Sequence, residues 1–100
     1  MRYPPVVALV NVVVRAKTLS AALQDAAALT GEIKRVAGEH VRVLGPAPAA
    51  LARLRGEYRA QLLAKGTNRR VMREAVQAGI AARPALARRL TVDVDPLSVL

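Results

Sequence analysis

The hydrophobic pattern opens with a β-branched run near the N-terminus. Residues 6–14 read VVALVNVVV, and Asn11 is the only polar side chain among them. Valine is stiff in a helix and packs well on a pleated surface, so the run predicts a strand. Because both faces of this strand are apolar, we expect it to be central in a sheet, with its second face available for cover from outside this chain.

Between residues 18 and 38 the apolar positions recur every three or four residues, and the charged positions fall largely on the other side. This period predicts an amphipathic helix of about five turns. Thr18 or Ser20 is able to cap its start, and Gly38 is placed to end it.

A second strand is predicted over Val41–Leu44. The GPAP segment at 45–48 breaks it, because proline donates no hydrogen bond to a sheet. Residues 49–55 are then predicted to form a helical turn that ends at Gly56. The side chains over residues 58–65 alternate between two faces, which predicts a third strand. A helix is the alternative, because Ala, Gln and Leu suit a helix equally.

The last third of the chain predicts a helix over residues 69–83, limited by Pro84, and a strand over residues 90–95, closed by Pro96. The order is strand, helix, strand, strand, helix, strand. It predicts an α+β fold of the ferredoxin-like, split βαβ class, with a four-stranded antiparallel sheet and both helices on one face. No linker or repeat divides the chain, so we expect one domain over residues 1–100.

Composition removes most catalytic chemistries from consideration. The chain has no Cys and a single histidine, His40, which excludes disulfides, thiolate metal sites and histidine clusters. Neither a GxxxxGK(S/T) loop nor a GxGxxG loop is present. We therefore assign no catalytic residue, metal site or cofactor to this chain. The apolar run at 6–14 is too short to cross a bilayer, so we expect no membrane partner.

Charge is the strongest functional signal in the sequence. The net charge is +9, and eleven of the sixteen basic residues lie between residues 42 and 89. The same range holds only two acidic residues, both glutamates. A concentrated positive field favours a polyanion or an acidic peptide as partner. An arginine-rich surface that serves only solubility is the alternative interpretation.

Five short segments resemble one family in the same order along the chain. They are YPP at 3–5, LGPAPA at 44–49 with the basic stretch after it, Tyr58-Arg59 with Gln61, Arg69, and VDVDP at 92–96. Together they resemble the C-terminal domain of primosomal protein N′, the PriA replication-restart DNA helicase. Ala60 stands where this family usually has a second aromatic residue, and its loss weakens base stacking.

The resemblance implies a fold similar to that of ribosomal protein S10 and a role in binding branched or single-stranded DNA. It also implies docking of the acidic C-terminal tail of single-stranded DNA-binding protein, at a pocket shared with the helicase core of the same polypeptide. ATP hydrolysis and zinc binding belong, on this resemblance, to parts of the helicase outside this chain. We accordingly expect an excised domain or a split gene product, located in the bacterial cytoplasm with the nucleoid.

Five basic residues are predicted to contact DNA: Arg42, Arg53, Arg55, Arg59 and Lys65. In the third predicted strand, Arg59 and Lys65 lie on the face opposite Tyr58. If helices cover the Tyr58 face, these cations lie on the open face of the sheet, where they can follow phosphates. A sheet face that is merely solvated is the alternative.

A second group of polar residues lies on the last predicted helix: Arg69, Arg70, Arg73 and Gln77. Arg69 and Arg73 are four residues apart and thus neighbours on one helix face. Helix N-termini attract anions, and arginine holds a carboxylate through two parallel bonds, so the group suits an acidic peptide with a free C-terminus. An apolar wall is also needed, and we expect it from the helicase core. A solvated helix face is the alternative.

Three rival functions share this order of elements. An RNA-binding module of the RRM type needs aromatic residues on its central strands, and residues 6–14 have none. An acylphosphatase-like enzyme needs a glycine-rich loop after the first strand, where RAKT stands at 15–18. The third rival is a stand-alone structural or dimerisation module that packs through the second face of the first strand.

Overall fold

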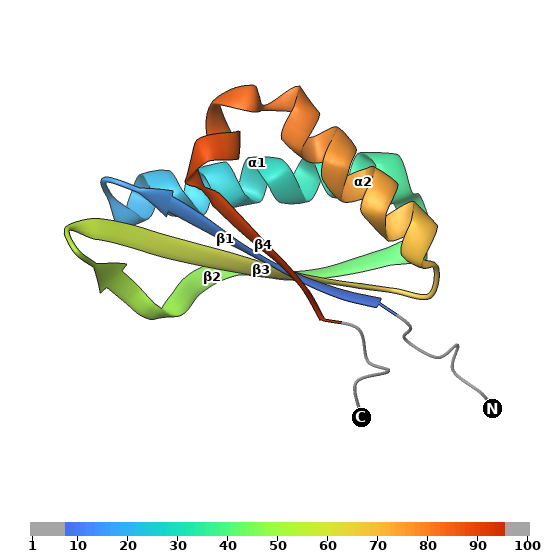
Figure 1. Cartoon of the computed structure of the whole chain (residues 1–100), viewed down its shortest axis with the longest axis horizontal. Coiled ribbons are helices and arrows are strands. Elements are labelled where there is room, and N and C mark those ends of the chain that lie inside the picture. The colour runs from blue at the N-terminus through green and yellow to red at the C-terminus, as the bar shows by residue number, and fades with distance from the viewer. Residues whose placement is uncertain (1–7, 96–100) are drawn as a thin grey trace.

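Two layers make up the structure, a four-stranded sheet and a pair of helices that cover one of its faces (Figure 1). The computed structural model describes residues 8–95. Its main elements are β1 (Ala8–Ala16), α1 (Leu19–Ala37), β2 (Val41–Leu54), β3 (Glu57–Gly66), α2 (Arg69–Ala82) and β4 (Leu90–Asp95). Short 3-10 segments at Gly38–His40 and Pro84–Arg89 precede β2 and β4.

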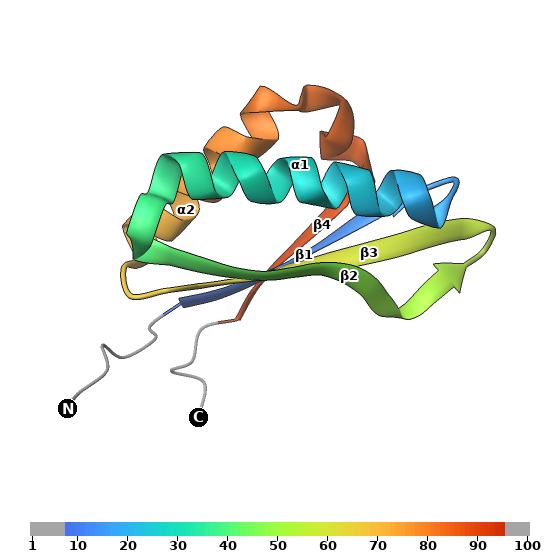
Figure 2. The same cartoon turned by 180° about the vertical axis from the view of Figure 1, so that it is seen from behind.

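The strands lie in the order β2-β3-β1-β4, and every neighbouring pair is antiparallel. Each helix therefore connects two strands that are not neighbours in the sheet, which is the split βαβ arrangement. Figure 2 shows from behind that α1 and α2 lie on the same side of the sheet. The predicted α+β, ferredoxin-like class is confirmed, and β1 is central as expected.

Local sequence sets the helix boundaries. Of the two candidate caps for α1, Thr18 takes the role, because its side chain accepts a backbone hydrogen bond from the first turn at 3.1 Å. Gly38 ends α1 with a φ of 60°, a left-handed conformation that costs glycine little. Asn68 caps α2 and accepts from two backbone N–H groups at 2.9 and 3.1 Å. The α2 boundary at Ala82 lies close to its predicted end.

β2 departs most from its predicted form. The sequence predicts a short strand over 41–44 and a helical turn over 49–55, whereas β2 runs as one strand from Val41 to Leu54. Its register with β3 shifts twice, around the GPAP segment and again after it. Residues 41–44 are in a strand as predicted, but the predicted end at Leu44 and the helical turn are wrong. Proline prevents regular pairing without preventing an extended backbone, and an edge strand tolerates unpaired positions.

Gly45 permits the first register shift. Its φ of 98° is one that other residues rarely adopt, and a Cβ there would lie 3.0 Å from the carbonyl oxygen of Gln61. The β2–β3 hairpin then closes through Arg55 and Gly56, with φ values of 54° and 80°. Positive φ at both loop residues matches the twist of the two strands, so the hairpin closes in two residues.

Small aliphatic side chains fill the space between the layers. Valines of β1 and alanines of β3 face the helices, and the largest fully buried side chains include Leu29, Ile33, Leu62 and Met72. The helices approach each other closely at Gly79, where an added Cβ would lie 2.8 Å from Cδ1 of Leu29. This close approach fixes the position of α2 over the sheet.

Hydrogen bonds join the end of β1 to the segment before β4. Arg15 Nη2 donates to the Arg88 carbonyl oxygen at 2.8 Å, and Arg89 Nη1 donates to the Arg15 carbonyl oxygen at 3.0 Å. Arg89 also forms an ion pair with Asp25 at 2.9 Å, in which the two side chains are only 36% and 30% exposed. These reciprocal contacts hold Arg15 and the start of β4 in a defined position.

Candidate binding surfaces

A hollow of about 270 Å³ lies between α2 and the strands β1 and β4, and we call it the α2 cavity. It is lined by Ala8, Val10, Arg69, Met72, Arg73, Val76, Gln77, Ile80 and Val92. The polar members all lie on α2, whereas the apolar members come from α2, β1 and β4. The cavity therefore combines a polar rim with an apolar floor.

The rim is formed by Arg69, Arg73 and Gln77, which stand at intervals of four residues on α2 and are all exposed. Three of the four residues predicted for peptide-tail binding are thus brought together by one helix face. The fourth, Arg70, does not line the cavity and lies 3.6 Å from Glu74 in an exposed ion pair. The fold separates Arg70 from the other three because it is rotated away from them on the helix.

The apolar floor differs from the expectation that a helicase core would supply the apolar wall. Val92 lies opposite Val12 in the β1–β4 pairing and thus on the helix-facing side, yet it is 39% exposed. Val10 and Met72 are almost fully buried beside it. The alternation over residues 90–95 predicts that Val92 faces inward. Its place in the floor of the cavity, however, depends on the pairing of β4 with β1.

The face of the sheet that points away from the helices is the open sheet face. Arg42 and Lys65 are direct partners in the β2–β3 pairing and lie at one end of this face. Arg59 lies six residues along β3 from Lys65, a separation of roughly 20 Å at strand spacing. Leu63 and Leu44 pair between these ends, and Leu44 is 45% exposed. The predicted DNA-binding cations on this face therefore stand at two ends of a surface that carries the exposed Asp93, opposite Asn11, between them.

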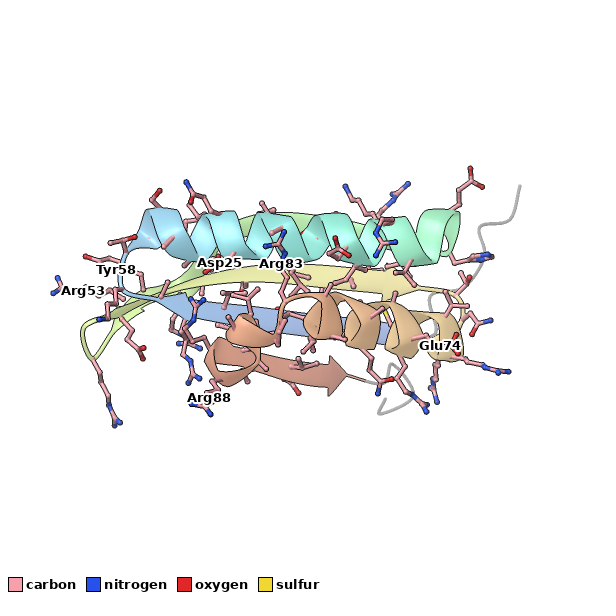
Figure 3. The ribbon with its side chains drawn as sticks, turned by 90° about the horizontal axis from the view of Figure 1, so that it is seen from above. Asp25, Arg53, Tyr58, Glu74, Arg83 and Arg88 are labelled. Atoms are coloured by element: carbon pink, nitrogen blue, oxygen red, sulfur yellow. The ribbon has the colours of Figure 1, made fainter. Side chains whose placement is uncertain are left out.

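Arg53 and Arg55 lie at the tip of the β2–β3 hairpin. Arg53 pairs with Tyr58, and its guanidinium carbon is 5.6 Å from the centre of the tyrosine ring, a cation–π contact. Figure 3, seen from the helix side, places both Arg53 and Tyr58 at one end of the molecule and Glu74 at the other. Arg53 therefore shares the face of Tyr58 and does not lie on the open sheet face with Arg59, whereas Arg55 occupies the turn itself.

The five predicted DNA-binding residues differ from Arg70 in their ion pairing within the part of the chain that the structure describes. Among the side chains that the structure describes, the ion pairs are Arg35–Glu32, Arg70–Glu74 and Arg89–Asp25. The five predicted DNA-binding residues are in none of them. In the first of these pairs, the pKa of Glu32 lies below its ordinary value because Arg35 donates a hydrogen bond to it and attracts its charge.

The described residues hold no group of three or more His, Cys, Asp or Glu side chains placed to bind a metal ion. None of the helices between residues 8 and 95 combines the length and the apolar character that crossing a bilayer requires.

The fold defines an α+β domain of the ferredoxin-like class, and comparison with known proteins assigns the family. Residues 1–97 match the model of the primosomal protein N C-terminal domain. The chain therefore belongs to the family of C-terminal domains of primosomal protein N, which confirms the resemblance drawn from its sequence.

A curated relative is the probable replication restart protein PriA of Deinococcus radiodurans. The two are 35% identical over 96 residues, which cover 96% of this chain and 10% of that protein. The chain thus spans about a tenth of the length of its relative. It corresponds to the small C-terminal part, and the catalytic domains of the larger protein are not in it.

Solved structures share the fold at low sequence identity. The de novo designed protein Foldit4 matches with a TM-score of 0.65 and 15% identity, over 88% of this chain and 92% of that one. The C-terminal DNA-binding domain of the MHV-68 latency-associated nuclear antigen matches with a TM-score of 0.53 and 10% identity, over 99% and 79% of the two chains. At these identities the likeness shows the fold alone.

Proposed function

We propose that this chain is a non-catalytic docking domain of a bacterial replication-restart helicase. In this proposal it binds the acidic C-terminal tail of single-stranded DNA-binding protein in the α2 cavity, and it contacts branched or single-stranded DNA through the open sheet face and the hairpin. The helicase core of the same polypeptide is its third partner, and it acts in the cytoplasm at the nucleoid. Membership of the family supports the role in a replication-restart helicase. The α2 cavity and the open sheet face with the hairpin support the two proposed ligands.

The observation that carries the proposal is the composition of the α2 cavity. Arg69 and Arg73 offer guanidinium groups that can hold a carboxylate through paired hydrogen bonds, and Gln77 extends the polar rim. The apolar floor around Val10 and Val92 suits a hydrophobic side chain next to that carboxylate. A peptide that ends in an apolar residue with a free carboxylate satisfies both halves of the cavity.

The position of the rim on its helix adds to this complementarity. Arg69 is the first residue of α2, and Asn68 already accepts from two of the first-turn N–H groups. The helix dipole places further positive potential at this end. An acidic tail approaching the cavity therefore meets the arginines and the dipole together.

The DNA contact rests on charge and accessibility. Arg42 and Arg55 are exposed, while Arg59 and Lys65 are half-buried on the strand with their charged ends facing outward from the helices. Such cations contact phosphates without reading sequence, so the proposed binding is weakened steeply by salt. The RNA-binding alternative has little support, because Tyr58 lies on the helix-facing side and leaves the described open face without an aromatic side chain.

A peptide titration tests the proposed function. The probe is a short acidic peptide with an apolar C-terminal residue, labelled at its N-terminus and followed by fluorescence anisotropy at fixed salt. Arg73→Glu should reduce its affinity at least tenfold, because it replaces an attraction with a repulsion at the rim. Arg70→Glu makes the same charge change on the same helix outside the cavity and serves as the matched control.

An amidated version of the peptide separates carboxylate recognition from general charge attraction. On the unmodified chain, the amidated peptide should bind more weakly than the free acid. On the Arg73→Glu variant, the two peptides should bind with equally low affinity. If Arg70→Glu and Arg73→Glu reduce affinity equally, or the amide binds as well as the acid, the α2 cavity is not the docking site.

A further inference from the structure

A second hollow lies on the open sheet face at the hairpin end of the molecule, and we call it the hairpin cavity. Its volume is about 240 Å³, and it is lined by Arg15, Arg55, Glu57, Arg59 and Thr91. Three guanidinium groups therefore surround one hollow that contains a single carboxylate. Arg15 is not among the residues predicted to contact DNA, because nothing in the sequence pairs it with the hairpin.

The fold places two of these arginines directly against each other. Arg15 of β1 and Arg59 of β3 are register partners, so their side chains leave the same face of the sheet next to one another. Like charges opposite each other on neighbouring strands destabilise a sheet. Arg55 adds a third positive charge from the turn, where its φ is 54°. Such a cluster is unfavourable for the free protein, and binding of an anion would relieve the repulsion.

The internal groups near the cavity do not neutralise it. Among the described side chains, Glu57 lies within ion-pair distance of none of the three arginines. Three guanidinium groups and one carboxylate leave two positive charges at the cavity. Two successive phosphodiester groups of a nucleic-acid backbone carry the matching negative charge.

Arg15 is already held in place before any ligand arrives. Its Nη2 donates to the Arg88 carbonyl oxygen at 2.8 Å, while its own carbonyl oxygen accepts from Arg89 at 3.0 Å. Arg89 in turn is fixed by its ion pair with Asp25. A guanidinium group has five N–H donors, so the bond to Arg88 leaves others for a ligand. A positioned side chain loses less conformational freedom on binding.

We propose that the hairpin cavity binds phosphate groups of a nucleic-acid backbone, with Arg15 and Arg59 as the principal ligands and Arg55 closing the cavity from the turn. The proposal rests on the proposed DNA binding of this domain and assigns that binding to a defined site. The carboxylate of Glu57 repels the phosphate groups, so the affinity for nucleic acid is lower than three arginines alone would give. Together with the Arg42–Lys65 pair, the cavity holds the backbone at both ends of β3.

Oligonucleotide binding by charge-matched variants tests the site. The probe is a labelled short oligothymidine, titrated with the 100-residue chain at several salt concentrations. Arg59→Gln should weaken binding about tenfold and lower the salt dependence by about 0.7, the contribution of one phosphate contact to single-stranded DNA. Arg88→Gln removes the same charge nearby, where only the backbone carbonyl takes part, and should have a much smaller effect.

Two further variants sharpen the result. Glu57→Gln should tighten binding, because it removes the one repulsive group in the cavity. Arg59→Lys should recover only part of the lost affinity, since lysine keeps the charge and loses the paired geometry. Circular dichroism of each variant confirms that the fold is retained. Equal losses in Arg59→Gln and Arg88→Gln, or no gain in Glu57→Gln, would overturn the proposal while leaving DNA binding elsewhere on the domain intact.

A separate measurement applies if the unmodified chain binds no oligonucleotide, which would refute the proposed DNA function. Inorganic phosphate is then titrated while the side-chain Nε signals of the arginines are followed by nuclear magnetic resonance. Saturable shifts of Arg15 and Arg59, without a shift of Arg88, would support an anion site in the hairpin cavity. Uniform, unsaturated shifts of all arginines would overturn it.

Discussion

The α2 cavity and the open sheet face carry similar residues in two different arrangements. On α2, a spacing of four residues lines up Arg69 and Arg73 over one hollow with an apolar floor. On β3, the spacing of a strand separates Arg59 from Lys65 by roughly 20 Å. A helix thus concentrates charge at a point, whereas a strand distributes it along a line. The first arrangement suits a compact ligand with one carboxylate, and the second suits an extended polyanion.

A charge in the floor of the α2 cavity should have the largest effect on peptide binding. Val92→Asp places a carboxylate beside Val10 and repels the carboxylate of the acidic peptide. We expect about a hundredfold loss of peptide affinity, or about 2.7 kcal/mol, and no comparable loss of oligonucleotide affinity.

Val36→Asp is the matched control for this change. Val36 lies on α1, is 42% exposed and lines neither cavity. Peptide and oligonucleotide titrations of both variants at one salt concentration measure the difference. A similar loss of peptide affinity in the control would show that the cavity floor has no special role.

The position of α2 can be disturbed without touching the cavity. Gly79→Ala brings a methyl group within 2.8 Å of Leu29 Cδ1, so the fully buried Leu29 side chain must shift to admit it. Overpacking of this kind costs about 1–3 kcal/mol, which exceeds the gain of about 0.5–1 kcal/mol in helix propensity. The free energy of unfolding from denaturant titration should fall, and peptide affinity should fall more than oligonucleotide affinity.

Gly31→Ala provides the opposite expectation on the neighbouring helix. No atom lies within 4 Å of a Cβ built at Gly31, so only the gain in helix propensity remains. This variant should be slightly more stable than the unmodified chain. If both substitutions stabilise the protein, the close approach of α1 and α2 does not restrain the cavity.

Removing both cations from the far end of the open sheet face tests the linear arrangement. Arg42→Gln combined with Lys65→Gln should lower the salt dependence of oligothymidine binding by about 1.4, twice the contribution of one phosphate contact. Lys17→Gln combined with Lys34→Gln removes the same charge outside this face. The two double variants should bind the peptide in the α2 cavity with equal affinity. A loss of peptide affinity in Arg42→Gln with Lys65→Gln alone would mean that the two surfaces are coupled.

The smallest effect is expected from Glu32, which lines neither cavity. Its pKa is lowered from 4.5 by the hydrogen bond and the charge of Arg35, with a smaller contribution from Arg83. A carboxyl group with a lowered pKa in the folded state adds stability above its unfolded pKa and loses it as the pH falls through the folded value. Thermal unfolding between neutral pH and about pH 3 should show a slightly shallower acid decline in Glu32→Gln.

The order of elements and the faces of the strands could be predicted because they depend on local periodicity. Ala60, Leu62 and Ala64 are buried as their alternation required, and Thr18 caps α1. The continuation of β2 beyond Leu44 could not be predicted, because it depends on pairing with β3 and on a register shift at Gly45 that no local pattern records. Nonlocal pairing decided the outcome against local propensity there.

The candidate sites show the same division. Arg69 and Arg73 of α2 could be placed together from helical spacing alone, whereas Arg70, predicted with them, lies outside the cavity. The floor of the α2 cavity and the position of Arg15 beside Arg59 depend on which strands become neighbours in the sheet. The sequence groups Arg53 with the other predicted DNA-binding residues, whereas its pairing with Tyr58 places it on the helix-facing side of the sheet.

The irregular course of β2 has a consequence for the behaviour of the domain at high concentration. A sheet with two free borders can recruit strands from other molecules and grow into fibrils. One border of this sheet carries Pro46 and Pro48, which offer no N–H groups to an incoming strand. The other is only six residues long and bears the exposed Asp93. A chain whose residues are 53% apolar thus carries its own protection against fibrillar growth at both borders.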